Sequence, residues 1–394
     1  MTANDIERPT LLHLAIDYND PHRPPTTRAI EWLVDELGDD YDNVVISMTR
    51  KTDPRQTYFW DCGSIGKAHV FAYGYEGLPF GIGLFGSMWW AARRIRRALQ
   101  ENGIRPDLIH AHKLGFEGLA GWLLARWYGV PLFVSLRGEV ETKIFRRKPT
   151  YRPLLRRVVE DAARIYHVSA WFRDEFHRHV PQTAKERLLP NIVRNIRPEI
   201  TTVPANDRFV SIMNLDIWKK KGLDTLLEGL AIARRTRPDL KLDIVGGGTE
   251  DAAHKARELA AEAGVTDAVR FLGKLDNAEL LARLPEYRAL LLPSSNETFG
   301  MVYVEALFAG IPVLHTAGTG IDGYLDGLDV SVGVPEGDAE AIASAMLHLD
   351  AETDTLRETL VRSAPELFRR FSKERLLADY RADVASALNI EPAA

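Results

Sequence analysis

The chain has 394 residues, of which 45% are hydrophobic and 27% charged, and this length predicts two soluble domains rather than a single core. Its one cysteine, Cys62, excludes an internal disulfide, and we expect it to be a buried small hydrophobe in a protein of the reducing cytoplasm. Because the chain starts with a polar, acidic segment and lacks an apolar run of about 18 residues, we expect neither a signal peptide nor a membrane-spanning helix.

The first half of the chain alternates short apolar strands with amphipathic helices. We expect strands at residues 11–16, 43–48, 107–112, 132–136 and 165–169, and helices at residues 28–37, 88–102, 118–128 and 171–179. Such alternation is typical of a parallel α/β sheet.

A proline-rich segment without clear periodicity, residues 190–207, predicts a linker between two domains. The pattern then restarts, with strands expected at 209–213, 240–245, 269–272, 289–292 and 313–315 and helices at 222–234, 250–264, 277–284, 300–309 and 356–388. We therefore expect an α/β protein with Rossmann-like domains at residues 1–200 and 201–370, facing each other across a cleft suited to ligands. Residues 371–394 form a candidate helix that packs back on the first domain.

The most informative stretch, residues 291–316, reads LLPSSNETFGMVYVEALFAGIPVLHT. Glu297 lies in a polar loop after a buried strand, and Glu305 lies eight residues later, inside the next helix. A helix that opens from a loop at the carboxyl end of a strand points free N–H groups and its positive dipole end outward. The stretch therefore predicts an anion site that holds a phosphorylated ligand.

This E-x7-E pattern, with Phe299-Gly300 after the first glutamate and Gly310 and Pro312 after the second, resembles that of the retaining glycosyltransferases of GT-B architecture, and within them family 4. The resemblance covers most of the chain. It implies a nucleotide-sugar donor, a UDP- or GDP-sugar, whose hexose-type sugar passes to an acceptor hydroxyl with retention at the anomeric carbon. It also implies a front-face mechanism, in which the leaving phosphate helps to deprotonate the acceptor.

The resemblance also implies roles for single residues. Glu305 would bind the nucleotide ribose, and Glu297 would contact the donor sugar near its reacting carbon. His112 would contact the sugar from the first domain, with His110 as the fallback and a purely structural histidine as the alternative. Lys221 resembles the phosphate-binding lysine of the family, and its alternative is a solvated lysine at a helix start.

A departing diphosphate builds negative charge, which cations and N–H donors stabilise. Lys221 and the backbone N–H groups of Phe299, Gly300 and Met301 suit this task. The other candidates for donor binding are Asn214, Lys219, Lys220, Gly246, Gly247, Lys274 and Leu275.

Three departures from the family pattern stand out. The first strand-to-helix loop, residues 17–28, has no glycine, and its Arg23 and Arg28 are expected to be solvated rather than to contact the donor. No arginine stands shortly before the lysine run, so the choice among Lys219, Lys220 and Lys221 for phosphate stays open. Arg137 stands where a histidine is frequent.

Charge is unevenly distributed. Residues 1–200 hold 29 Lys and Arg against 24 Asp and Glu, whereas residues 201–394 hold 21 against 31. A basic helix with Arg93, Arg94, Arg96 and Arg97 follows Trp89-Trp90 and, with Arg137, forms the candidate acceptor or membrane side. Either these residues meet an anionic lipid surface or lipid-linked sugar, or the tryptophans pack inward and the arginines form a solvated face. Nucleic acid is a less suitable partner for these basic residues, because the net charge of the chain is −5 and no nucleic-acid-binding motif is present.

Other chemistries fit the sequence less well. No DxD motif flanked by apolar strands and no His/Cys cluster with metal-ligand spacing occurs, so no metal or other cofactor is expected to be required. A retaining hydrolase needs its carboxyls about 5–5.5 Å apart, whereas eight helical residues span roughly 12 Å. Glu297 and Glu305 therefore suit two separate binding roles.

We expect a cytoplasmic glycosyltransferase of cell-surface polysaccharide or glycolipid assembly, with peripheral attachment to the inner face of the membrane left open. One alternative is a sugar-nucleotide epimerase on the same fold, which needs no acceptor. The other is a non-catalytic protein that only binds a nucleotide-sugar. The donor base, the sugar, the acceptor and the oligomeric state also stay open.

Overall fold

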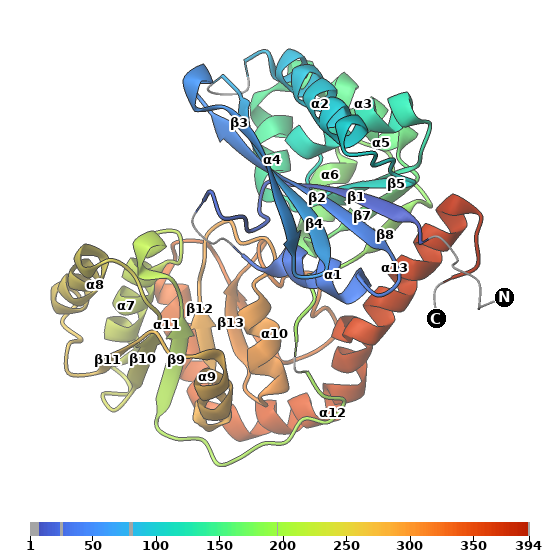
Figure 1. The fold of residues 1–394 in the computed structure, drawn as a ribbon. Coiled ribbons are helices and arrows are strands. Elements are labelled where there is room, and N and C mark those ends of the chain that lie inside the picture. Colours follow the sequence, from blue (N-terminus) through green and yellow to red (C-terminus); the bar gives the residue numbers. More distant parts are fainter. Residues whose placement is uncertain (1–7, 24–26, 79–81, 195, 393–394) are drawn as a thin grey trace. The chain divides into compact units, whose positions relative to one another are not determined.

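The computed structural model describes residues 8–23, 27–78, 82–194 and 196–392, so the polar N-terminal segment lies outside the described residues. The chain divides into two compact units, each an α/β layer structure (Figure 1). Unit 1 comprises residues within 1–168, 172–192 and 373–394, and unit 2 comprises residues 169–171 and 193–372. Two Rossmann-like sheets confirm the expected fold class.

The sheet of unit 1 has the order β3-β4-β2-β1-β5-β6-β7-β8. Its strands are β1 (Thr10–Ala15), β2 (Asp42–Lys51), β3 (Tyr58–Ile65), β4 (Ala68–Glu76), β5 (Leu108–Ala111), β6 (Leu132–Leu136), β7 (Arg164–His167) and β8 (Glu186–Leu188). All neighbours pair in parallel except β3 and β4, which form an antiparallel hairpin at one edge. Cys62 lies on this edge, where it is half-buried and packs against a core cluster, so the expected small hydrophobe is less buried than predicted.

The helices of unit 1 are α1 (Ala29–Leu37), α2 (Leu84–Glu101), α3 (Phe116–Tyr128), α4 (Glu139–Arg147), α5 (Arg152–Asp161), α6 (Arg173–His177) and α13 (Lys373–Leu388). Helices α1 and α13 pack on one face of the sheet, and α2, α3 and α5 lie on the other (Figure 1). Tyr380 of α13 is fully buried in a cluster with Phe133 and Tyr166. The ion pairs Lys373–Glu36 (3.0 Å) and Arg381–Asp40 (2.7 Å) also fasten α13.

The sheet of unit 2 is wholly parallel, in the order β11-β10-β9-β12-β13-β14. Its strands are β9 (Arg208–Ile212), β10 (Lys241–Val245), β11 (Val269–Gly273), β12 (Leu290–Leu292), β13 (Val313–Thr316) and β14 (Ser331–Val334). Its helices are α7 (Leu223–Ala233), α8 (Glu250–Glu262), α9 (Asn277–Arg283), α10 (Met301–Phe308), α11 (Ala339–Ala351) and α12 (Thr353–Phe371). The four central strands of this sheet are largely apolar and buried on both faces, as a parallel sheet requires, whereas the edge strands β11 and β14 are mostly not buried.

Two glycines let the loops at the carboxyl edge of this sheet approach one another. Gly246 follows β10 with φ +150°, and a Cβ atom there would lie 1.7 Å from the carbonyl oxygen of Met213. Gly222 starts α7 with φ +69°, and its Cβ would lie 2.3 Å from the carbonyl oxygen of Pro293. Only glycine tolerates both conditions. The loops after β9, β10 and β12 are thereby packed together.

Candidate functional site

Lys221 and Glu297 meet at this carboxyl edge of unit 2. Lys221 ends the loop after β9, Glu297 lies in the loop after β12, and Lys221 Nζ donates to Glu297 Oε2 at 2.6 Å. Each side chain is 18% exposed, so the pair is accessible yet partly shielded from water. Partial burial strengthens the attraction relative to an exposed surface pair. The structure therefore brings together two of the predicted residues that lie 76 positions apart.

The other two lysines of the run differ in their surroundings. Lys219 is exposed, and Lys220 is half-buried. The backbone carbonyl of Lys220 accepts from Ser295 N at 2.8 Å and from Ser295 Oγ at 3.1 Å. These bonds tie the lysine loop to the loop that carries Glu297 and so keep the backbones of Lys221 and Glu297 near each other.

The backbone of Glu297 is held by a third loop, which follows β13. Glu297 N donates to Thr319 Oγ1 at 2.6 Å, and Thr319 Oγ1 in turn donates to Glu297 O at 2.8 Å. Gly320 N donates to the same carbonyl at 2.9 Å. Thr319 itself is buried. The carboxylate of Glu297 is thus carried on a rigid backbone while its charge faces Lys221.

Helix α10 starts at Met301, four residues after Glu297. Phe299 is fully buried and packs edge-on against Tyr324 at 5.3 Å between ring centroids. Gly300 is the residue before the helix, with φ +74°, and Met301 is its first residue. The first N–H groups of a helix have no intrahelical acceptor and carry partial positive charge. Together with Lys221, this helix start can hold an anion.

Glu305 lies in the second turn of α10. Its side chain is half-buried, and burial raises the pKa of its carboxyl. No hydrogen-bond or ion-pair partner of this carboxylate occurs among the described residues. A half-buried, unpaired acceptor is costly to a fold. Such a group gains most from a ligand that donates hydrogen bonds, and vicinal hydroxyls do so.

The remaining predicted donor residues surround the glycine loop after β10. Gly247 O accepts from Leu215 N at 2.8 Å, and a Cβ on Gly247 would lie 3.4 Å from Lys274 Cβ. Asn214 is exposed and caps the short turn Leu215–Ile217, where its Oδ1 accepts from Asp216 N at 2.9 Å. Lys274 is exposed, and the adjacent Leu275 is half-buried. The surroundings of the loop Gly246–Gly248 therefore include the polar residues Asn214 and Lys274 and the apolar residue Leu275.

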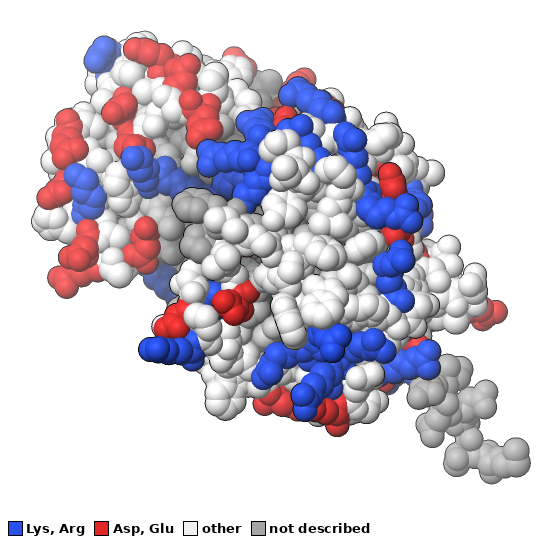
Figure 2. All heavy atoms as spheres, turned by 90° about the horizontal axis from the view of Figure 1, so that it is seen from above, with Lys and Arg blue, Asp and Glu red and all other residues white. Residues whose placement is uncertain are grey.

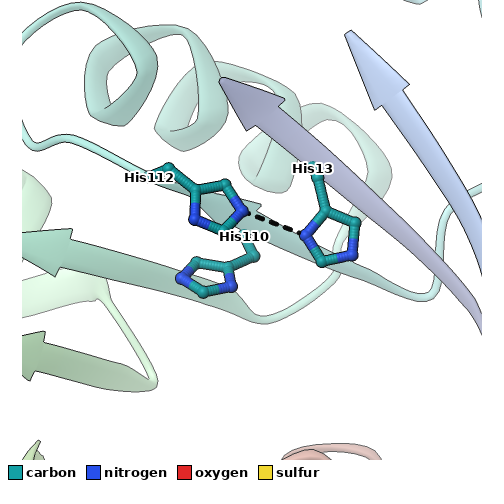
Figure 3. A group of neighbouring side chains, drawn as sticks. All are labelled: His13, His110 and His112. Atoms are coloured by element: carbon teal, nitrogen blue, oxygen red, sulfur yellow. Dashed lines mark hydrogen bonds between the residues drawn. The ribbon is translucent and has the colours of Figure 1, made fainter. Parts of the chain in front are cut away.

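In unit 1, three histidines gather where β1 and β5 pair (Figure 3). His13 stands opposite His110 across the two strands, and His112 follows β5 on the same side as His110. His13 Nδ1 lies 3.1 Å from His112 Nε2, and His13 Nε2 lies 3.1 Å from Asn43 Oδ1. All three histidine side chains are at most 1% exposed.

Burial controls the protonation of this cluster. Desolvation lowers the pKa of His13 to about 4 and brings the pKa values of His110 and His112 well below the usual range. The rings are therefore neutral at pH 7. His110 uses both ring nitrogens within the fold, Nδ1 with Tyr380 OH at 3.0 Å and Nε2 with Ser135 Oγ at 2.9 Å. Of His110 and His112, only His112 keeps a ring nitrogen, Nδ1, without a hydrogen-bond partner among the described residues.

Arg137 is buried beside His112 rather than exposed to an acceptor. Its Nε donates to His112 O at 3.2 Å and its Nη1 donates to Asn191 Oδ1 at 3.2 Å. Burial lowers its pKa. Arg137 thus supports the backbone that carries His112, a role that the sequence did not predict.

Two buried carboxylates, also missed, fix the neighbouring loops. Glu117 Oε1 accepts from Ile16 N at 3.0 Å after β1, and burial raises the pKa of Glu117 to about 7. Glu141 Oε1 accepts from Leu114 N at 3.1 Å after β5. No short motif marks either residue, because their partners are backbone groups far away in sequence.

Arg23 and Arg28 of the first loop behave differently from each other. Arg23 is nearly buried: it donates to the carbonyls of Ile16 and Tyr18 and pairs with Asp20 at 3.3 Å. The expected solvation of Arg23 was therefore wrong, because the loop carbonyls need donors. Arg28 pairs with Glu31 and is 57% exposed, which agrees with solvation.

Helix α2 and strand β4 border a groove of about 1110 Å³. It is lined by Tyr73, Tyr75, Trp89, Trp90, Arg93 and Arg97, among others. Trp90 is 67% exposed, so the alternative in which both tryptophans pack inward is wrong for this residue. Arg93 Cζ lies 4.8 Å from the Trp89 ring centroid. Figure 2 shows clusters of Lys and Arg side chains beside uncharged surface.

Two clusters among the described residues combine metal-ligand atoms within 4.8 Å of one another: His13, His110 and His112, and His167, His177 and Glu186. Sequence spacing could not reveal them, because their members come from different elements. In the first cluster His13 bonds to His112, while His110 bonds to Tyr380 and Ser135. In the second, His167 Nε2 contacts Glu186 Oε2 at 2.8 Å and His177 Nε2 contacts the same oxygen at 3.2 Å. Among the described helices, none is long and apolar enough to cross a membrane.

Two family models match the chain. The model for glycosyl transferases group 1 matches residues 198–366, and the model for the glycosyl transferase 4-like domain matches residues 26–192. Together they correspond to unit 2 and to most of unit 1.

Curated relatives are similar at moderate identity. The chain is 27% identical over 286 residues to a phosphatidyl-myo-inositol mannosyltransferase of Mycobacterium leprae, covering 71% of this chain and 72% of that protein. It is 28% identical over 267 residues to a glycogen synthase of Mycobacterium tuberculosis, covering 62% of this chain and 60% of that protein. With a D-inositol 3-phosphate glycosyltransferase of Streptomyces avermitilis it is 28% identical, over 53% of that protein.

Solved structures share the fold. Sucrose-phosphate synthase from Thermosynechococcus elongatus superposes with a TM-score of 0.71 at 20% identity, covering 96% of this chain and 100% of that one. HepE of Anabaena, solved with UDP and glucose, superposes with a TM-score of 0.66 at 17% identity and the same coverage. At these identities the likeness concerns the arrangement of strands and helices.

Proposed function

The chain belongs to the glycosyl transferases of group 1, and from this premise we propose that it moves a hexose-type sugar from a nucleotide-sugar to an acceptor hydroxyl with retention at the anomeric carbon. The observation that carries the proposal is the Lys221–Glu297 pair at the start of α10. A cation, a helix start and a carboxylate suit a diphosphate leaving group joined to a reacting sugar.

The proposed division of labour follows from the contacts. Lys221 and the N–H groups of Phe299, Gly300 and Met301 stabilise charge on the departing phosphate. Glu305 accepts from the ribose hydroxyls, because its carboxylate is half-buried and without a partner in the described chain.

The other donor groups have more general tasks. The glycine loop, Gly246 and Gly247, lets the nucleotide approach the backbone, with Asn214, Lys274 and Leu275 beside it. Lys219 and Lys220 add positive potential around the diphosphate. In unit 1, His112 contacts the donor sugar. No metal or other cofactor is required in this scheme, because Lys221 and the helix start meet the charge.

The donor base is the first property to test. HepE was solved with UDP and glucose, which favours a UDP-sugar over a GDP-sugar as the first candidate. We expect the matching nucleotide and its sugar to raise the melting temperature of this protein, because a ligand that binds only the folded state stabilises it by mass action. Melting curves with UDP, GDP, ADP, dTDP and their sugars measure this. No shift with any of them would exclude the proposed donor class.

Products separate the proposal from its two alternatives. A glycosyltransferase forms a glycosylated acceptor and releases nucleoside diphosphate with it. An epimerase on this fold would return an inverted sugar-nucleotide without an acceptor. A binding protein would give a thermal shift and no turnover with any acceptor.

For the acceptor we propose an anionic, lipid-linked molecule that reaches the protein at the groove of α2. Exposed Trp90 beside Arg93, Arg94 and Arg97 combines apolar insertion with positive charge, which suits an anionic membrane surface. Work at cell-surface polysaccharide or glycolipid assembly, from the cytoplasmic face of the membrane, follows from such an acceptor.

Replacing Arg93, Arg94, Arg96 and Arg97 with serine should release the protein from anionic vesicles. Each basic residue near such a surface contributes about 1 kcal/mol, so four substitutions should weaken binding by at least 100-fold. Sedimentation with vesicles of phosphatidylglycerol and phosphatidylcholine measures the effect. The matched control replaces four exposed arginines of unit 2, Arg235, Arg257, Arg362 and Arg369, with serine. Equal loss in both variants, or no sedimentation of the wild type, would contradict the membrane proposal.

A further inference from the structure

The three-residue chain Asn43–His13–His112 links a ring nitrogen at the end of β5 to the interior of unit 1. None of its bonds involves a charged group, and each is between buried side chains. Hydrogen positions along such a chain follow from its fixed end, because each donor requires an acceptor opposite.

Asn43 is the fixed end. Its Nδ2 donates to Val34 O at 3.3 Å and to Tyr41 O at 3.4 Å. Carbonyl oxygens only accept, so the amide nitrogen must face them and Oδ1 must face His13. The rotamer of the Asn43 amide is therefore determined by the backbone.

The orientation of the Asn43 amide determines which ring nitrogen of His13 carries the hydrogen. Because Asn43 Oδ1 accepts, His13 Nε2 carries the hydrogen of their 3.1 Å bond. A neutral imidazole has one N–H, and so His13 Nδ1 is the bare acceptor. Its contact at 3.1 Å with His112 Nε2 then requires that His112 Nε2 carry the hydrogen. The dashed line in Figure 3 marks this last bond.

His112 Nδ1 is the ring nitrogen at the free end of this hydrogen-bond chain. With Nε2 protonated and the ring neutral, Nδ1 keeps a lone pair, and it has no hydrogen-bond partner among the described residues. The neighbouring ring of His110 does not compete, because Tyr380 and Ser135 occupy both of its nitrogens. Arg137 holds the carbonyl of His112, which fixes the backbone below the ring.

We propose that His13 and Asn43 are positioning residues that hold His112 in its Nε2–H tautomer, so that His112 Nδ1 accepts a hydrogen bond from a hydroxyl of the donor sugar. This inference rests on the proposed function for the identity of the hydroxyl, but not for the tautomer. The opposite tautomer would present an N–H, which a sugar hydroxyl could meet only by turning its own hydrogen away.

Nitrogen-15 NMR of the histidine rings in the ligand-free protein tests the tautomer directly, with His112→Gln assigning the signal. We expect a protonated Nε2 and an unprotonated Nδ1 for His112. An Nδ1–H tautomer in the wild type would overturn the proposal, and so would stoichiometric metal in the purified protein, since a metal would displace the hydrogen between the rings. This NMR measurement tests the tautomer independently of whether the protein turns over a nucleotide-sugar.

Two substitutions at His13 then test the consequence. His13→Asn keeps an acceptor near the position of Nδ1, whereas His13→Phe keeps the ring and removes the acceptor. We expect His13→Phe to lose about 10-fold in kcat/KM for the nucleotide-sugar, the effect of one hydrogen bond, and to retain the wild-type Kd for the nucleoside diphosphate, which has no sugar. His13→Asn should recover most of the loss.

Equal activity of His13→Phe and the wild type would overturn the positioning role. So would equal losses in His13→Phe and His13→Asn, because a merely structural histidine would be sensitive to size rather than to an acceptor. If His13→Phe fails to fold, the wild-type spectrum and His13→Asn still decide the question. A protein that binds no nucleotide at all would refute the proposed function, while the spectrum would still report the tautomer.

Discussion

Replacing Glu297 with glutamine is expected to lower turnover by about 100- to 1000-fold, the loss typical of one electrostatic group at a reacting centre. The substitution keeps the size of the side chain and removes its charge. In the proposed mechanism this carboxylate faces the sugar carbon, where positive charge develops as the diphosphate departs. An uncharged amide stabilises that charge far less.

The same substitution should not weaken binding of the nucleoside diphosphate. Lys221 Nζ is engaged with Glu297 Oε2 at 2.6 Å. Removal of the carboxylate charge frees this ammonium group for phosphate, so the Kd should stay constant or fall. Steady-state kinetics and calorimetric titration with the nucleotide measure the two effects separately.

The control for Glu297→Gln is Glu336→Gln, which changes an exposed carboxylate after β14. It should leave both turnover and affinity at the wild-type level. Near-wild-type turnover of Glu297→Gln would remove Glu297 from the reacting centre. A joint fall of turnover, nucleotide affinity and melting temperature would instead indicate that the pair with Lys221 is structural.

Much of the fold could be predicted because both sheets have buried central strands. Strands such as β1, β9 and β12 read as continuous apolar runs, and their helices end at glycine or proline. The edge hairpin of β3 and β4 was missed, since no residue of β3 is fully buried and polar residues interrupt its apolar ones. Strand β14 and helix α11 were missed as well, because one contains glycine and few buried residues and the other is alanine-rich.

The candidate site was predictable only where it is local in sequence. Glu297, Glu305 and the start of α10 lie within one short stretch, so their order and spacing could be seen. That Lys221 rather than Lys219 contacts Glu297 could not be predicted, because this contact depends on the turn Leu215–Ile217 and on the positive φ of Gly222.

The chain Asn43–His13–His112 could not be predicted either, because its members are far apart in the sequence. His13, Asn43 and His112 come from separate strands or strand ends, and a single histidine or asparagine in a strand has no telling pattern. Only the pairing of β1 with β2 and β5 brings them into contact. Arg23 was misjudged for a related reason, since the carbonyls that it satisfies become neighbours only when the loop folds.

Replacing Lys221 with alanine is expected to weaken nucleoside diphosphate binding by at least about 10-fold and to lower turnover further. The substitution removes the cation proposed for the diphosphate, and it also leaves the Glu297 carboxylate without its partner. A half-buried, unpaired carboxylate repels the incoming phosphates, so the loss should exceed that of one ordinary charged hydrogen bond. Calorimetric titration with the nucleotide measures it.

Lys219→Ala is the matched control, because Lys219 lies two positions earlier in the same loop and is exposed. Its effect on the Kd should be small, and a larger effect than that of Lys221→Ala would transfer the phosphate role to Lys219. The double variant Lys221→Ala/Glu297→Gln should bind the nucleotide more tightly than Lys221→Ala alone, since the repelling charge is gone. Such non-additivity is the signature of two residues that interact directly. Strictly additive effects would mean that the 2.6 Å contact has no part in how the site receives its ligand.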